Sequence, residues 1–217
     1  MDRSPRNVYQ QGDHVCTLFS SREEQVNAAV DYIRGGLSRG ERCLYVCGEQ
    51  TPDEFRAELR GASIDPAAEE KRGALLLITK REHLKGGSFK ASRMIETLAG
   101  AVADALKAGF AGLCAAGDMT WLLDEAPGSR EIVEYEALLN HFYASNQALG
   151  LCQYNRNRLP AKFLDTCLAT HRHIRVAGPM LLENPFYELP EDAMTIPRDG
   201  EGVDEKIAQL GAMSAAS

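Results

Sequence analysis

The chain has 217 residues, of which 44% are hydrophobic and 25% are charged, a composition that excludes a disordered or fibrous protein and suits one compact domain. The net charge is −7 and the basic residues are scattered, which argues against direct nucleic-acid binding because phosphate contacts need clustered lysine and arginine. No apolar run approaches the roughly 18 residues of a membrane span, and the N-terminus lacks a secretory signal, so we expect a cytoplasmic protein that does not contact membranes.

Apolar runs alternate with amphipathic stretches along the first half of the chain, a pattern typical of parallel strands joined by helices. We therefore predict an α/β fold. Thr51 and the proline and acids that follow it favour the start of a helix. The predicted elements are a strand over 14–19, a helix over 23–38, a strand over 42–47 and a helix over 52–60.

The run over 73–79 is apolar, which suits a strand that is buried on both faces. We expect this strand at the centre of the sheet, and we expect Leu76→Ala to cost about 2–5 kcal/mol as a buried large-to-small substitution. A polar connection with two glycines follows over 80–89. It is a candidate lid over a binding site.

The second half continues the alternation. The predicted elements are a helix over 90–108, a strand over 110–119, a helix over 129–147, a strand over 149–154, a short helix over 162–170, a candidate edge strand over 174–176 and a turn over 184–187. We divide the chain into an N-terminal arm over 1–10, a domain over 11–190 and an acidic extension over 191–217. The extension is expected to be partly disordered, with one peripheral helix around 203–210.

A phosphate-binding loop is missing where nucleotide-binding α/β proteins carry one, after the first strand. Such a loop has the pattern GxxxxGK[ST], in which backbone amides and a lysine hold the phosphates. Residues 19–25 supply neither the glycines nor the lysine. Two acids could still line the cleft. Glu49, beyond the second strand, could polarise water, and Asp118, at the end of the fourth strand, could hold a metal ion. We expect a protein that is not an enzyme, with a residual nucleotide hydrolase as the alternative.

Polar side chains stand at the carboxyl ends of the predicted strands, where open α/β sheets bind ligands. Asp118 and Trp121 follow the fourth strand. Tyr154, Asn155 and Arg156 end the fifth strand and would suit an oxygenated or anionic small ligand. The alternatives are a tryptophan that covers the core and a strand end that is polar only because it reaches water.

His14 and Cys16 lie on the first strand, which leads into the same cleft. His14 could cap a turn or bind a ligand or metal, because neutral imidazole is a common metal ligand. The six cysteines contain no CxxC pair, and most fall in apolar runs, so we expect buried reduced thiols. A metal- or haem-dependent redox sensor using His14 and some cysteines is the alternative. His171 and His173 are poorly spaced for one metal ion, and we predict neither metal nor cofactor.

Five segments together give the chain a family resemblance through their order and spacing. It resembles the MEDS domain, the methanogen/methylotroph DcmR sensory domain, over roughly residues 8–190. The segments are Gly-Asp-His-Val-Cys at 12–16, the stretch over 36–46, Gly-Asp-Met-Thr-Trp at 117–121, Cys-Gln-Tyr at 152–154 and Asn-Pro-Phe-Tyr at 184–187.

The resemblance implies a fold similar to the RecA/KaiC ATPases without their phosphate loop, a three-layer sandwich with a mainly parallel sheet and helices on both faces. Members are regarded as sensors of simple hydrocarbon derivatives in prokaryotic signalling, usually joined to kinases or DNA-binding modules. We therefore expect a sensory domain that binds a small ligand at the carboxyl edge of the sheet and signals through a kinase or a transcription regulator. The oligomeric state, including a homodimer, is left open.

Overall fold

The computed structural model of the chain describes residues 8–84, 89–125, 127–176, 178–196 and 198–216. Over these residues, seven strands form one sheet in the order β3-β2-β4-β5-β1-β6-β7, and all neighbours are parallel except β6 and β7. The strands are β1 (His14–Phe19), β2 (Arg42–Cys47), β3 (Leu75–Thr79), β4 (Leu113–Asp118), β5 (Ala148–Asn155), β6 (His173–Val176) and β7 (Leu182–Glu183).

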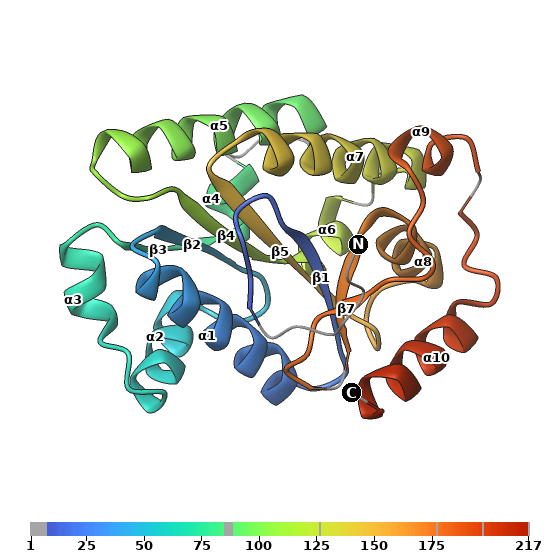
Figure 1. Ribbon diagram of the computed structural model, residues 1–217, viewed down its shortest axis with the longest axis horizontal. Coiled ribbons are helices and arrows are strands. Elements are labelled where there is room, and N and C mark those ends of the chain that lie inside the picture. The colour runs from blue at the N-terminus through green and yellow to red at the C-terminus, as the bar shows by residue number, and fades with distance from the viewer. Residues whose placement is uncertain (1–7, 85–88, 126, 177, 197, 217) are drawn as a thin grey trace.

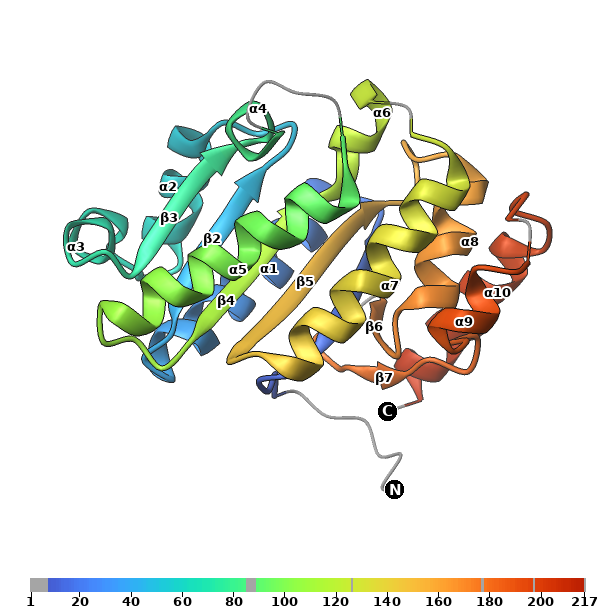
Figure 2. The ribbon, with the colours of Figure 1, turned by 90° about the horizontal axis from the view of Figure 1, so that it is seen from above.

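Helices cover both faces of the sheet, which confirms the predicted three-layer α/β sandwich (Figure 1). One face carries α1 (Arg22–Ser38), α2 (Pro52–Gly61) and α3 (Pro66–Lys71), and the other carries α5 (Ala91–Lys107), α7 (Ser129–Ser145) and α8 (Ala161–Thr170). Seen from above, α5 and α7 lie side by side across the strands (Figure 2). Shorter elements are α4 (Lys80–Leu84), η1 (Met119–Trp121), α6 (Leu122–Glu125), α9 (Pro190–Ala193) and α10 (Val203–Ala215).

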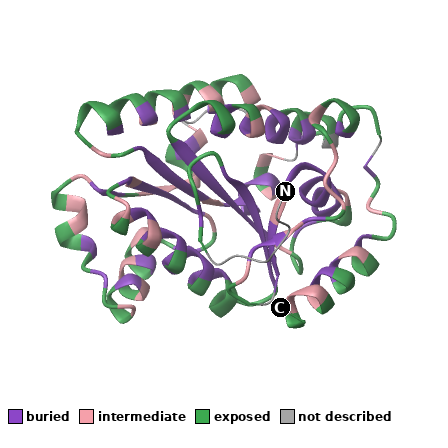
Figure 3. Cartoon of the chain, viewed as in Figure 1, coloured by how far each residue is buried: buried purple, intermediate pink, exposed green. Residues whose placement is uncertain are grey.

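The core follows from this layering. Buried residues fill the inner strands and the inward sides of the helices (Figure 3), and every residue of β1 is buried because helices cover it from both sides. Helix α1 lies close to the sheet at Gly36, where a Cβ would come within 2.6 Å of the Cys114 sulfur and 2.7 Å of the Cys43 sulfur. No helix in the described ranges is long and apolar enough to cross a membrane.

The central position predicted for the strand over 73–79 is wrong. β3 pairs only with β2 and forms one edge of the sheet, and Leu76 is 39% exposed. The large cost expected for Leu76→Ala therefore belongs to its neighbour Leu75, which is 1% exposed. An apolar run shows that a strand has apolar neighbours, but it does not show how many strands flank it.

Three further segments differ from the prediction. Residues 80–84 form α4, started by Thr79 and Glu82 in mutual side-chain-to-backbone hydrogen bonds, while the rest of the candidate lid, 85–88, lies outside the described residues. β6 is an inner strand, because β7 pairs with it. Helix α10 continues past the predicted 203–210 to Ala215, and its buried residues include Val203 and Leu210.

The ends of the chain are described only in part. Of the predicted arm over 1–10, residues 1–7 lie outside the described residues, and Tyr9 is buried with its ring edge-on to that of Tyr32, 4.8 Å away. Within the predicted extension over 191–217, α9 ends at Ala193 and α10 packs against β6, β7 and α8. The residues at 197 and 217 lie outside the described part.

Candidate functional site

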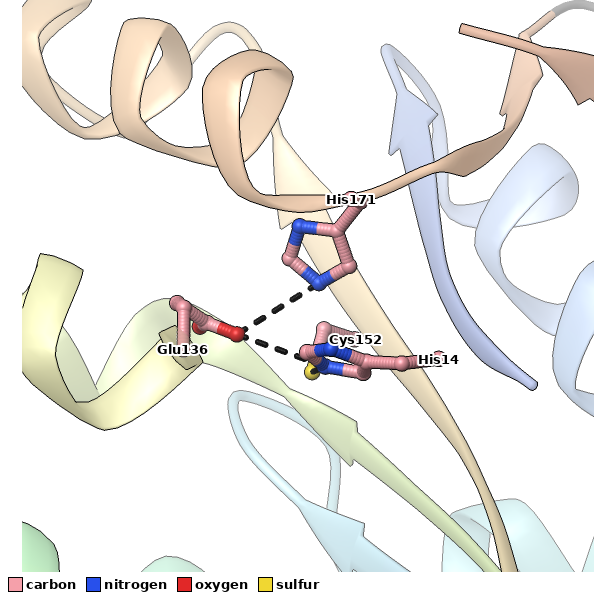
Figure 4. Close-up of side chains that lie close together, drawn as sticks. All are labelled: His14, Glu136, Cys152 and His171. Atoms are coloured by element: carbon pink, nitrogen blue, oxygen red, sulfur yellow. Dashed lines mark hydrogen bonds and ion pairs between the residues drawn. The ribbon is translucent and has the colours of Figure 1, made fainter. Parts of the chain in front are cut away.

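Four buried side chains with titratable groups meet between the sheet and the helices α7 and α8 (Figure 4). His14 comes from β1, Cys152 from β5, Glu136 from α7 and His171 from the residue after α8. One nitrogen, sulfur or carboxylate oxygen from each lies within 4.8 Å of those of the others. Four chain segments that are far apart in sequence thus each place one titratable side chain in the same small region.

The pairing of β1 with β5 sets the sheet side of this cluster. Cys16 lies opposite Cys152 in the parallel register, so His14, two residues earlier on β1, projects from the same face. His14 itself lies opposite Gly150, where a Cβ would fall 2.3 Å from the Tyr143 ring. The glycine lets that ring approach the sheet, with its centroid 5.3 Å from that of His14.

Glu136 makes both of the dashed contacts in Figure 4, one to each histidine. Its Oε2 is 3.3 Å from His14 Nε2 and 3.4 Å from His171 Nε2. The Cys152 sulfur is 3.5 Å from His14 Nε2. The second carboxylate oxygen, Oε1, accepts a 2.6 Å hydrogen bond from the Tyr154 hydroxyl, so only Oε2 faces the two imidazoles.

The outer ring nitrogens fix the tautomers of both histidines. The Asn140 amide nitrogen donates to the Thr170 carbonyl at 2.8 Å, which turns the amide oxygen toward His14 Nδ1 at 3.1 Å. His171 Nδ1 lies 2.9 Å from the Cys167 carbonyl. Because both partners are acceptors, each Nδ1 carries the proton and each Nε2 presents a lone pair to Glu136.

Burial favours the uncharged form of every member. Desolvation lowers the pKa of His14 to about 4 and that of His171 well below its ordinary value, and it raises the pKa of Glu136 to about 7 and that of Cys152 well above its ordinary value. Glu136 Oε2 and His171 Nε2 are both buried and have no hydrogen-bond partner among the described residues. When Glu136 is ionised, two acceptor atoms therefore face each other, whereas the protonated carboxyl could donate to His171 Nε2.

A disulfide joins Cys16 on β1 to Cys167 on α8 beside this cluster. The expectation of reduced thiols is therefore wrong for these two cysteines. It holds for Cys43, Cys47, Cys114 and Cys152, which are free and buried. The pairing spans 151 residues of sequence, so no local spacing could have predicted it.

Three of the predicted site residues belong to this cluster or touch it. His14 is a member, Tyr154 donates to Glu136, and Cys16 forms the disulfide with the segment that carries His171. The cluster lies on a face of the sheet, away from the carboxyl edge where these residues were expected to act. The sequence analysis missed Glu136. The signal that could have found it is an acid on the apolar face of a helix, since Ile132 and Leu139 lie on the same face.

The other predicted residues lie at the carboxyl edge, where their partners are the protein's own groups. Asp118 is 1% exposed and accepts from Gln25 Nε2 at 2.8 Å and from the Thr120 backbone at 2.9 Å. Glu49 forms a 2.5 Å surface ion pair with Arg158. Close packing leaves no room beside Asp118, because a Cβ on Gly48 would fall 2.4 Å from its carboxylate.

The remaining two residues of the fifth strand end do not point to a common site. Asn155 accepts a hydrogen bond from the Asn157 backbone at 3.0 Å, and Arg156 is exposed. Tyr154 faces the interior instead, which follows from the alternation of side chains along β5.

Trp121 is buried beside a small, partly open cavity. It is 1% exposed and packs against Phe89 and Tyr135, with ring centroids 5.0 and 6.2 Å away. The cavity has a volume of about 40 Å³ and lies between β2, β4 and β5 and the helices α5 and α7. Its lining is mostly apolar, and includes Leu44, Val46, His83, Leu98, Ala115, Gly117, Met119, Trp121, Tyr135, Leu139, Tyr143 and Cys152. Cys152 thus borders both the cavity and the titratable cluster.

The N-terminus of α1, where a phosphate loop would deliver its anion, is capped by the chain itself. The Ser21 hydroxyl accepts from the Glu24 backbone at 3.2 Å, and the Glu24 carboxylate accepts from the Ser20 backbone at 2.6 Å. A carboxylate thus occupies the positive end of the helix, where a bound phosphate would lie.

Comparisons with known proteins agree with this architecture. The sequence profile of the MEDS family, the methanogen/methylotroph DcmR sensory domain, matches residues 13–172. A solved KaiC-like protein from the hyperthermophilic archaeon Pyrococcus horikoshii OT3 has a similar fold, with a TM-score of 0.53 at 13% sequence identity over 77% of this chain and 72% of that chain. This likeness confirms the predicted RecA/KaiC-like fold. No curated protein matches the chain.

Proposed function

Because the chain belongs to the MEDS family of sensory domains, we propose that it is a non-enzymatic sensor that holds a small, largely apolar molecule in the cavity beside Trp121. The observation that carries this proposal is the cavity itself. It lies beneath the carboxyl ends of β2 and β4, where Val46 and Gly117 line it, and its walls are predominantly apolar. Small-molecule sites have this character, with few polar groups among apolar walls.

The size of the cavity limits the ligand. A volume of about 40 Å³ gives room for roughly three water-sized groups, since one such group needs about 10–15 Å³. A molecule of three or four heavy atoms gains at most about 1.5 kcal/mol per atom, so we expect dissociation constants of tens of micromolar or weaker. One- to three-carbon halides, alcohols and thiols fit these limits.

Nucleotide binding is the weaker alternative. The Glu24 carboxylate over the start of α1 would repel a phosphate at that position. Asp118 is engaged by Gln25 and Thr120, and Glu49 is paired with Arg158. These contacts leave neither acid free to act on a phosphate, which supports a sensor rather than a hydrolase.

Signalling requires that the ligand favour one conformation over another. His83 brings α4 to the cavity wall, and Trp121 does the same for the short segment after β4. We propose that a ligand biases the packing of these two elements and that a cytoplasmic partner, such as a kinase or a transcription regulator, recognises the change.

The proposal is tested by titrating the full chain with a panel of small halides, alcohols and thiols and monitoring its methyl groups by NMR. Gly117→Ala adds a methyl group to the cavity wall with only an ordinary 3.6 Å contact to Val46, so the fold should persist while binding is lost. Gly100→Ala is the matched control, because its new Cβ meets nothing within 4 Å at an exposed position of α5. Failure of the whole panel to bind, or equal binding by Gly117→Ala, would refute the cavity as the sensing site.

A further inference from the structure

We propose that His14, Glu136, Cys152 and His171 form a binding site for one divalent transition-metal ion, best matched by zinc. The set supplies two imidazole nitrogens, one carboxylate oxygen and one sulfur. These are the ligand types that zinc takes in proteins, and four of them complete its preferred tetrahedral coordination. Of the four residues of this site, only Cys152 also lines the cavity.

The distances match a tetrahedral ion. Bond lengths of about 2.0–2.1 Å to nitrogen, 2.0–2.2 Å to oxygen and 2.3 Å to sulfur place nitrogen about 3.4 Å from oxygen and about 3.5 Å from sulfur. The corresponding separations are 3.3 Å and 3.4 Å from Glu136 Oε2 to the two Nε2 atoms, and 3.5 Å from Cys152 Sγ to His14 Nε2. Three of the six edges of such a tetrahedron therefore already have the expected length, and the other three ligand pairs lie within 4.8 Å.

The orientation of the ligands is a second, independent observation. The tautomers fixed by Asn140 and by the Cys167 carbonyl aim both Nε2 lone pairs at Glu136 Oε2. No lysine or arginine in the described part of the chain pairs with Glu136, so the ionised carboxylate would meet the two imidazole lone pairs without a cation. A bound metal ion would satisfy Glu136 Oε2 and His171 Nε2, the two atoms of this cluster that lack hydrogen bonds to described residues.

The surrounding contacts resemble the outer shell of a metal site. A ligating histidine commonly donates a hydrogen bond from its other ring nitrogen to a carbonyl or amide oxygen, as His14 and His171 do here. A ligating carboxylate commonly accepts a hydrogen bond of its own, and Glu136 accepts one from the Tyr154 hydroxyl. Asn140, Tyr154 and the Cys167 carbonyl are therefore assigned as positioning groups that hold the ligands in place.

A purely structural cluster is the competing account. A protonated Glu136 could donate to His171 Nε2, and the Cys152 thiol could donate to His14 Nε2, which would satisfy all four groups without metal. A second metal set, Cys16, Cys167 and His171, is also close enough in space. The disulfide between its two cysteines removes their ligating thiolates, which leaves the first set as the site.

Metal analysis of the full chain, stripped by a chelator and reloaded with zinc or cobalt, tests the site. We expect about one ion per chain, and visible cobalt bands with a thiolate charge-transfer band. Cys152→Ser should remove the charge-transfer band. Glu136→Gln and Cys152→Ser should weaken binding more than about 100-fold, since even outer-shell partners are worth about 10–100-fold. Cys47→Ser, a buried free cysteine outside the cluster, is the matched control.

Each result decides between the accounts. Wild-type protein that retains well under one ion per chain after reloading overturns the proposal, whatever the variants do. Binding that survives Cys152→Ser but is lost in Cys167→Ser assigns the metal to the second set and also overturns it. Gly117→Ala should load normally, so a failed metal test and a failed small-molecule test point to different sites.

Discussion

Burial of His83 at the cavity wall should make the protein less stable at acidic pH, and the substitution His83→Gln should remove this contribution. Desolvation lowers the pKa of this imidazole from 6.5 to about 4. Below pH 6.5 the unfolded chain binds a proton that the folded chain does not take up, so stability falls as the pH drops toward 4. The difference between the two pKa values corresponds to about 3 kcal/mol when fully developed, and to about 2 kcal/mol at pH 5.

Urea unfolding of the wild-type protein and His83→Gln at about pH 7.5 and pH 5 measures this contribution. The wild type should lose about 2 kcal/mol more than the variant between these two conditions. Comparing the two proteins cancels the acid destabilisation that His14 and His171 contribute to both, because their pKa values are also lowered by burial. Equal losses of stability in both proteins would show that His83 is solvated, and would contradict the position of α4 at the cavity wall.

Three other substitutions test the packing and the cluster. Gly36→Ala should destabilise the protein by about 1–3 kcal/mol in thermal or urea unfolding, because the new methyl group overlaps two cysteine sulfurs; an unchanged stability would mean that α1 can move away from the sheet. Leu75→Ala should cost about 2–5 kcal/mol, and Leu76→Ala clearly less, by the same measurement, because only Leu75 is fully buried; equal costs would contradict the edge position of β3. Tyr154→Phe should weaken zinc binding about 10–100-fold in a competition titration with a chelator, because it removes the hydrogen bond that orients Glu136; unchanged affinity would contradict a positioning role.

The sequence predicts the elements well and their neighbours poorly. β1, β2, α1 and α2 were found nearly at their observed bounds, since hydrophobic periodicity and the cap at Thr51 are local signals. The position of β3 was missed because strand order depends on crossovers that periodicity does not encode. Helix α4 was missed although Thr79 and Glu82 form a start signal that the sequence displays.

The candidate cluster shows the same division between local and distant information. His14 could be singled out, because a histidine entering a buried strand is unusual in itself. The sequence offers His173 as the neighbour of His171, whereas the partners of His171 in space are His14 and Glu136. Convergence of four segments is a property of the fold, and no local pattern in one sequence encodes it.

The carboxyl edge of the sheet, the usual binding place in this fold, is closed in this chain by its own side chains. Glu24 caps α1, Gln25 holds Asp118, and Arg158 pairs with Glu49. Glu136 Oε2 and His171 Nε2, which lack hydrogen bonds among the described residues, and the small cavity lie instead between the sheet and the helix layer of α5, α7 and α8. Cys152 borders both, so a molecule in the cavity would lie against a ligand of the proposed metal ion. If both proposals hold, zinc-loaded and zinc-free protein should differ in affinity for the same small molecule, and by linkage the small molecule should change zinc affinity by the same factor.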